Sequence, residues 1–304
     1  MRGEALGDAD TASEIPAAPV AGVVGERDGG TAARPPFDAV LSDVDGTLLR
    51  PTHALSARTR DAVRACVARG MAFGIVSGRM PSGVIPLVAE LGVPASVVCY
   101  SGAYVLGPAG EEVASVTIPV ARAREVLALL DELWPSVEPC YFVGPHWFAE
   151  NPDAPMVVRE AGIVGAVPEP ARYPALLDTG LAPNKIFCSC ADAPGRSAEM
   201  ERVLTARFPD LTVIRSTSGV LVEIVPAGVD KAIGARRLLD HLGLSMGRTL
   251  YFGDDANDVP LLRAAGRGVA MGNAAREIRK AADDVTGSNA DDGLADYLER
   301  KVLA

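Results

Sequence analysis

From Phe37 onward, short apolar runs alternate with segments in which apolar residues recur at helical spacing. Such runs are typical of buried strands, and the segments between them are typical of amphipathic helices. Strands are predicted at 37–41, 71–76 and 96–100. One helix is predicted from an N-cap at Ser56 to a stop at Gly70, and a shorter one before Gly92. This alternation predicts a doubly wound parallel sheet with helices on both faces.

A different pattern occupies residues 108–226. It predicts a long helix with four apolar residues facing inward: Val126, Leu127, Leu130 and Leu133. It then predicts a hairpin at 141–148, a strand at 185–190, a helix at 197–208, and strands at 211–215 and 220–225. We interpret this stretch as an inserted α/β unit.

The first pattern resumes after Pro226. Asp230 is predicted to cap a helix, and strands at 249–252 and 269–271 flank a helix that contains Leu261. A terminal helix ends near Arg300. The predicted core therefore comprises residues 37–107 plus 227–304, with the insertion at 108–226 between its two parts.

Residues 1–36 differ from both patterns. They contain 6 Gly, 4 Pro and 8 Ala without a sustained period, which predicts a disordered tail. A signal peptide is the alternative, but Arg2 is the only early cation and Pro19 interrupts the one apolar stretch. We therefore expect a cytoplasmic protein.

Composition narrows the function classes. The 304 residues predict about two domains. The 29 Lys and Arg against 39 Asp and Glu give a net charge of −10, which argues against nucleic acid as a partner. No uncharged apolar stretch approaches the roughly 18 residues of a membrane span. The five cysteines are expected to be reduced, buried thiols, with Cys188 and Cys190 on one face of a strand. The sequence indicates no particular oligomeric state.

Polar clusters follow three of the predicted core strands, where open α/β sheets bind their ligands. They are Asp43-Val44-Asp45-Gly46-Thr47-Leu48, Ser77-Gly78-Arg79 and Gly253-Asp254-Asp255-Ala256-Asn257-Asp258. A fourth element, Lys231, lies in the first turn of the helix that follows the insertion.

These residue types favour a metal site that handles phosphate. Two carboxylates about 4 Å apart repel by about 4 kcal/mol at an effective dielectric constant near 20. Asp43, Asp254 and Asp258 gathered at one sheet edge therefore require a cation, and oxygen ligands favour Mg²⁺. Asp43 would then be a nucleophile toward phosphorus, and Asp45 would exchange protons with the leaving oxygen and with water.

The remaining polar residues would bind the phosphoryl group. The Ser77-Gly78 loop would supply the Ser77 hydroxyl and backbone N–H donors, and Lys231 would supply positive charge.

Together, these clusters resemble motifs one to four of the haloacid dehalogenase (HAD) superfamily, and the insertion resembles the C2-type cap of its Cof-like phosphatases. The resemblance covers about residues 37–300. It implies a Rossmann-like core, a phosphorylated Asp43 and a general acid/base at Asp45. True dehalogenases lack the second acidic residue, so Asp45 favours phosphoryl chemistry.

The same resemblance implies a set of ligands. Mg²⁺ would be held by the Asp43 carboxylate, the Asp45 backbone carbonyl and Asp254, with Asp258 binding the metal or orienting a bound water. Asn257 would assist near the phosphoryl group.

The substrate is expected to be a small phosphorylated molecule, either a sugar phosphate, a phosphorylated cofactor or a related metabolite. The polar and aromatic candidates in the insertion are Tyr141, His146, Trp147, Asn184, Lys185 and Arg215, with His146 the foremost. Two other functions stay open: a phosphomutase of the same fold, and a non-catalytic protein that binds a metabolite.

Overall fold

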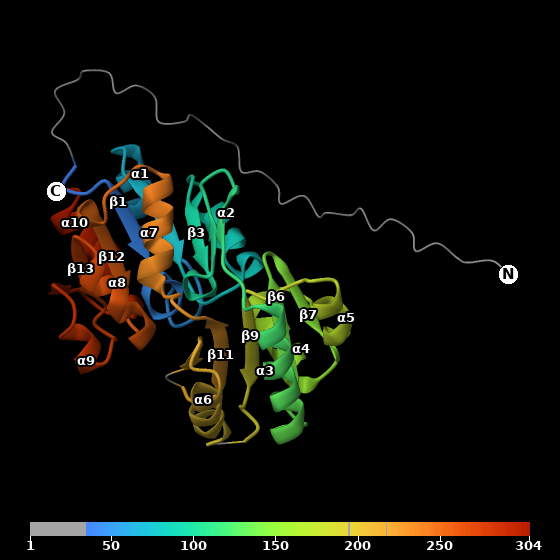
Figure 1. The fold of residues 1–304 in the computed structure, drawn as a ribbon. Helices are drawn as coiled ribbons and strands as arrows, with labels where there is room; N and C mark the ends of the chain where they lie inside the picture. The colour runs from blue at the N-terminus through green and yellow to red at the C-terminus, as the bar shows by residue number, and fades with distance from the viewer. Residues whose placement is uncertain (1–34, 194, 217) are drawn as a thin grey trace.

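The structure, a computed structural model, describes residues 35–193, 195–216 and 218–304 (Figure 1). The tail predicted at 1–36 lies outside these ranges except for its last two residues. The chain forms two sheets. Helices pack against each sheet, so the described residues have the α/β fold class that the sequence predicts.

The larger sheet has eight strands in the order β14-β13-β12-β1-β2-β3-β4-β5. Its strands are β1 (Ala39–Ser42), β2 (Ala72–Val76), β3 (Ser96–Cys99), β4 (Tyr104–Leu106), β5 (Glu112–Ser115), β12 (Thr249–Gly253), β13 (Arg267–Ala270) and β14 (Asp284–Val285). The strands from β14 to β3 are parallel to their neighbours, whereas β4 and β5 pair antiparallel at one edge. The prediction of a parallel core is confirmed, and β5 lies beyond the boundary expected at residue 107.

Helices cover both faces of this sheet, because alternate strand residues point to opposite sides. Leu41 packs in one apolar cluster with Leu238 and Leu261, whereas Val40 packs in the other with Val63 and Leu298. The first face carries α7 (Lys231–His241), α8 (Val259–Ala264) and α9 (Arg276–Arg279), and the second carries α1 (Ala57–Ala68), α2 (Ile85–Leu91) and α10 (Gly293–Lys301). Short helical turns lie at 44–48, 81–83, 100–102, 246–248, 256–258 and 289–291.

The smaller sheet has six strands in the order β10-β11-β9-β6-β7-β8. They are β6 (Pro139–Val143), β7 (His146–Ala149), β8 (Glu169–Pro170), β9 (Lys185–Ser189), β10 (Leu211–Arg215) and β11 (Leu221–Pro226). One face packs against α3 (Val120–Leu133), α5 (Tyr173–Asp178) and α6 (Arg196–Arg207). In contrast, α4 (Pro155–Val164) contributes Val157 to the apolar cluster that contains Val40 of the larger sheet. One face of the smaller sheet thus has an apolar core separate from the two clusters of the larger sheet.

One inward residue of the long helix was predicted wrongly. Val126 and Leu130 are buried, but Leu133 is 45% exposed. The helix ends at Leu133, and the next residue, Trp134, is buried in this core instead.

The five cysteines are free and buried, and Cys188 and Cys190 share one apolar core as expected. None of the helices in the described ranges is both long and apolar enough to cross a bilayer. In Figure 1, the chain passes from β11 of the smaller sheet into α7, which packs against the larger sheet.

Candidate active site

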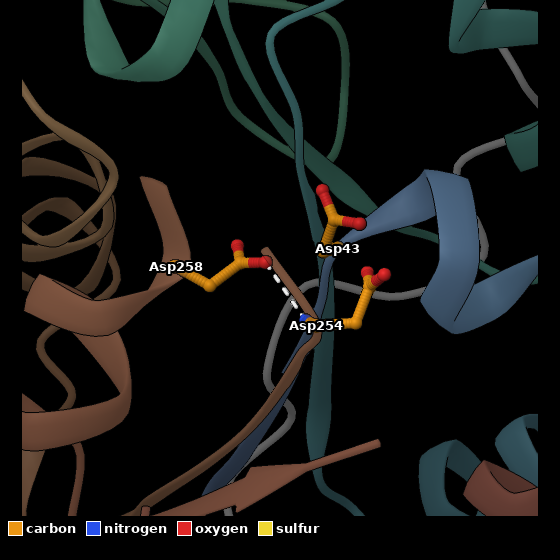
Figure 2. Close-up of side chains that lie close together, drawn as sticks. All are labelled: Asp43, Asp254 and Asp258. Atoms are coloured by element: carbon orange, nitrogen blue, oxygen red, sulfur yellow. Dashed lines mark hydrogen bonds between the residues drawn. The ribbon is translucent and has the colours of Figure 1, made fainter. Parts of the chain in front are cut away.

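Three carboxylates meet at the carboxyl edge of the larger sheet. Asp43 follows β1, and Asp254 and Asp258 follow β12, its parallel neighbour. One oxygen from each side chain lies within 4.8 Å of the others. Figure 2 shows Asp43 and Asp254 side by side, with Asp258 reaching toward the Asp254 backbone.

Lys231 joins two of these carboxylates. Its Nζ lies 2.6 Å from Asp43 Oδ1 and 2.6 Å from Asp258 Oδ1, and the residue is 2% exposed. Lys231 is the first residue of α7, whose N-cap Asp230 accepts a hydrogen bond from the Ile233 N–H. The helix start therefore aims the ammonium group at the carboxylates.

Asp258 connects Lys231 to the loop that follows β12. Its Oδ1 accepts from Lys231 and from the Tyr251 hydroxyl, and its Oδ2 accepts from the backbone N–H groups of Asp254 and Asp255 at 2.9 Å each. Both oxygens are thus bound within the protein. Asp258 is fully buried, so this arrangement orients the loop that carries Asp254.

Asp254 is held by the loop that follows β1. Its Oδ1 accepts from Thr47 Oγ1 at 2.8 Å, and its Oδ2 accepts from Asn273 Nδ2 at 3.2 Å. Gly46 lies against the same carboxylate with φ of +84°, and a Cβ there would be 2.1 Å from Asp254 Oδ2. Only glycine allows this close approach without movement.

The charge balance suits a cation. Burial raises the pKa of Asp43 well above its usual range; Lys231 lowers it, and Asp258 and Asp254 raise it further. Burial also raises the pKa of Asp254 to about 6. Three carboxylates therefore face one buried ammonium group, and their oxygen-only donor set fits a hard divalent ion such as Mg²⁺.

Asp45 lies at the open side of the site. Its side chain is 48% exposed, and its carboxylate accepts from Arg79 Nε at 2.8 Å and Nη2 at 2.5 Å. His53 Nδ1 lies 3.4 Å from Asp45 Oδ1. Asp45 and Arg79 both line the cleft described below, so this carboxylate is accessible to a ligand there.

The Ser77-Gly78 loop and Asn257 border the same space. Ser77 is 2% exposed, and its Oγ accepts from the Arg79 N–H at 3.2 Å. Asn257 lines the cleft, and no described residue hydrogen-bonds its buried Oδ1. The structure therefore brings together the eight predicted catalytic, phosphate-binding and metal-binding residues of the strand ends and of α7, which are Asp43, Asp45, Ser77, Gly78, Lys231, Asp254, Asn257 and Asp258.

A cleft of about 340 Å³ lies between the two sheets. Three of the six candidates in the insertion line it: Trp147, Lys185 and Arg215. Asn184 and Tyr141 instead make buried contacts within the fold, with Asn184 accepting from the Gly144 N–H and Tyr141 donating to the Leu181 carbonyl.

The expectation for His146 is wrong. Its side chain is 53% exposed, outside the cleft lining, and its Nδ1 lies 2.9 Å from Glu169 Oε1. Alternation along β7 explains this, because Trp147 points toward the cleft and its two neighbours point to the opposite face.

The sequence model of the haloacid dehalogenase-like hydrolase family matches residues 40–298. The chain belongs to this family. A putative phosphatase of Haemophilus influenzae is 32% identical over 87% of this chain and 98% of its own length. An HMP-PP phosphatase of Serratia proteamaculans is 26% identical over 84% of this chain and 92% of its own. A haloacid dehalogenase-like hydrolase from Bacteroides thetaiotaomicron superposes with a TM-score of 0.78 at 27% identity, covering 87% of this chain and 99% of its own.

The sequence analysis did not identify two residues that contact the site of this hydrolase. Asn273 donates to the Gly46 carbonyl and to Asp254, and Tyr251 donates to Asp258. Asn273 follows β13, so the rule used for the other strand ends could have found it. Tyr251 lies inside β12, where an apolar run conceals its hydroxyl.

Proposed function

We propose that this hydrolase is a Mg²⁺-dependent phosphatase that releases inorganic phosphate from a small phosphorylated metabolite. The observation that carries the proposal is the Asp43 carboxylate, buried beside Lys231 and Asp254, with the Asp45 carboxylate on the cleft side. This arrangement provides a nucleophile and a separate proton donor at one opening.

The reaction would proceed in two displacements. An Asp43 oxygen attacks phosphorus, the bond from phosphorus to the leaving oxygen breaks, and Asp45 donates a proton to that oxygen. Asp45 then accepts a proton from water as the water oxygen attacks phosphorus and releases Asp43. Ser77, Gly78, Lys231 and Asn257 would hold the phosphoryl oxygens throughout.

The site contains residues that could hold the metal. The Asp43 carboxylate, the Asp45 backbone carbonyl and Asp254 would hold Mg²⁺, and Asp258 would support them from behind. When bound, Mg²⁺ would offset negative charge on the phosphoryl group.

The cleft supports a small substrate. Its volume of about 340 Å³ is near the lower end for ligand pockets. The names of two relatives, a putative phosphatase and an HMP-PP phosphatase, support a phosphorylated metabolite. The predicted insertion at 108–226 would act as the cap over this substrate.

The test is phosphate release from sugar phosphates, nucleotides, pyridoxal phosphate and flavin mononucleotide, with and without Mg²⁺. We expect Mg²⁺-dependent release that is abolished in Asp43→Asn and retained in Asp61→Asn, an exposed carboxylate on α1. Full turnover by Asp43→Asn would refute the mechanism. Phosphate that moves to a second position of the substrate without release would indicate a mutase.

A further inference from the structure

Lys185 of the smaller sheet reaches across to the larger one. It lies on β9, its side chain is 5% exposed, and its Nζ donates to the Gly78 carbonyl at 2.8 Å. The same Nζ lies 3.0 Å from Glu223 Oε1 on β11. A buried ammonium group is costly unless it is paired, and here one of its two partners is the loop after β2.

Three aromatic rings surround this ammonium group. Nζ lies 5.3 Å from the ring centroid of Tyr100, 5.0 Å from that of Phe142 and 5.4 Å from that of Phe187. Cations are attracted to aromatic faces within about 6 Å. Tyr100 follows β3 of the larger sheet, and the other two rings lie on strands of the smaller one, so Nζ is held between the two units.

The contact at Gly78 anchors the carbonyl side of the Gly78–Arg79 peptide. Its carbonyl accepts from Lys185, and its N–H donates to Ser77 Oγ at 3.2 Å. Ser77 is itself anchored, since its N–H donates to Val98 O and its carbonyl accepts from the Ser101 N–H. Because Ser77 Oγ accepts the Arg79 N–H, its own proton is left for a group in the cleft.

We propose that Lys185 is a positioning residue that aims the Ser77 hydroxyl at the phosphoryl group through the Gly78–Arg79 peptide. This inference rests on the proposed phosphatase function. It assigns Lys185, carried by the insertion, to the phosphate-binding half of the site. Without this lysine, the Gly78 carbonyl loses its partner, the peptide rotates more freely, and the hydroxyl loses its fixed direction.

A double-mutant cycle tests the coupling. Four full-length proteins are compared: Glu223→Gln alone, which avoids a stranded buried carboxylate, and the same protein with Lys185→Met, with Ser77→Ala, or with both. We expect Lys185→Met to lower kcat/KM by about 10- to 100-fold when Ser77 is present, mainly through kcat, and by less than about threefold in Ser77→Ala. Equal losses in both backgrounds would overturn the proposal.

Two further measurements are needed. The first distinguishes the positioning role from a general loosening of the contact between the two units, and the second distinguishes it from the proposed phosphatase function. Tyr100→Phe removes another buried hydrogen bond between the two units, to the Gly144 carbonyl, and keeps the ring. We expect it to stay within about twofold of wild type, and a loss as large as that of Lys185→Met would overturn the proposal.

The same cycle is also measured on the Kd of inorganic phosphate by calorimetry. Coupling there without turnover of any monoester would refute the phosphatase function and retain the positioning role. Turnover with additive losses would refute only the positioning role, and a wild type that neither hydrolyses a monoester nor binds phosphate would overturn both.

Discussion

At the residue scale, backbone conformation and local contacts decide which side chains the site tolerates. Gly46 and Gly70 have nearly the same φ, +84° and +83°. A Cβ on Gly46 would meet the Asp254 carboxylate, whereas no described atom lies within 4 Å of a Cβ on Gly70. The two glycines therefore separate backbone strain from damage to the site.

We expect Gly70→Ala to lower the free energy of unfolding by about 1 to 2 kcal/mol, because it adopts the left-handed region, and Gly46→Ala to lower it by more, because its Cβ also overlaps Asp254. Only Gly46→Ala should reduce turnover, by about 100-fold, since it displaces Asp254. Denaturant unfolding and phosphate release measure the two effects. Comparable turnover in the two variants would contradict this reading of Gly46.

Asp292 predicts a pH dependence of stability. The hydrogen bond from Arg50, with Nε–Oδ1 at 2.9 Å, lowers the pKa of this carboxyl. The stabilisation is therefore complete above the unfolded pKa of about 4 and is lost as pH falls through the lower folded value. Asp292→Asn also tolerates the φ of +57°.

We expect Asp292→Asn to cost about 1 kcal/mol at pH 7, because Arg50 is partly exposed. The cost should shrink below about pH 4, as followed by urea unfolding across pH. A cost that is constant with pH would show that the charge is not responsible.

At the element scale, helix starts place functional groups. Asp230 accepts from the Ile233 N–H at 2.7 Å at the start of α7, and Ser56 accepts from the Thr59 N–H at 3.0 Å at the start of α1. In both caps a side-chain oxygen accepts the backbone N–H of the residue three positions along the chain. Only α7 begins with a residue of the site, Lys231.

Asp230→Ala and Ser56→Ala should therefore each cost about 1 kcal/mol of stability. Asp230→Ala should also lower turnover about tenfold, because fraying of α7 displaces Lys231 from Asp43. Thermal unfolding and phosphate release with saturating Mg²⁺ distinguish them. If Ser56→Ala loses as much turnover, the link between cap and lysine is wrong.

At the scale of the whole molecule, the acidic cluster exists only when the β1 and β12 loops are assembled. A cation that binds this cluster binds the folded chain and not the unfolded one. Metal binding must therefore raise the free energy of unfolding.

We expect Mg²⁺ at about 100 times its Kd to add about 2.7 kcal/mol. This corresponds to a Tm about 5 to 10 °C above that in EDTA. Asp254→Asn should lose most of this shift in scanning calorimetry. An equal shift in that variant would place the ion elsewhere.

Local signals in the sequence determined much of the fold. Ser56, Gly92 and Asp230 mark helix ends because capping depends on residues within a few positions. The predicted parallel sheet also indicated that Asp43 and Asp254 would meet, because both follow strands and parallel strands end at one edge. The short antiparallel strands β4 and β5 were not predicted, because three or four residues carry little periodicity.

Contacts across long stretches of chain were decided only by the tertiary structure. His146 faces away from the cleft and Trp147 faces it, a choice set by the strand's register in its sheet. The pairing of Asp45 with Arg79 and the reach of Lys185 to Gly78 depend on how the loops and the two sheets pack. Residue types and spacing thus determined which groups are available for chemistry. Packing decided which of them touch, because contact energies between distant segments leave no local pattern in the sequence.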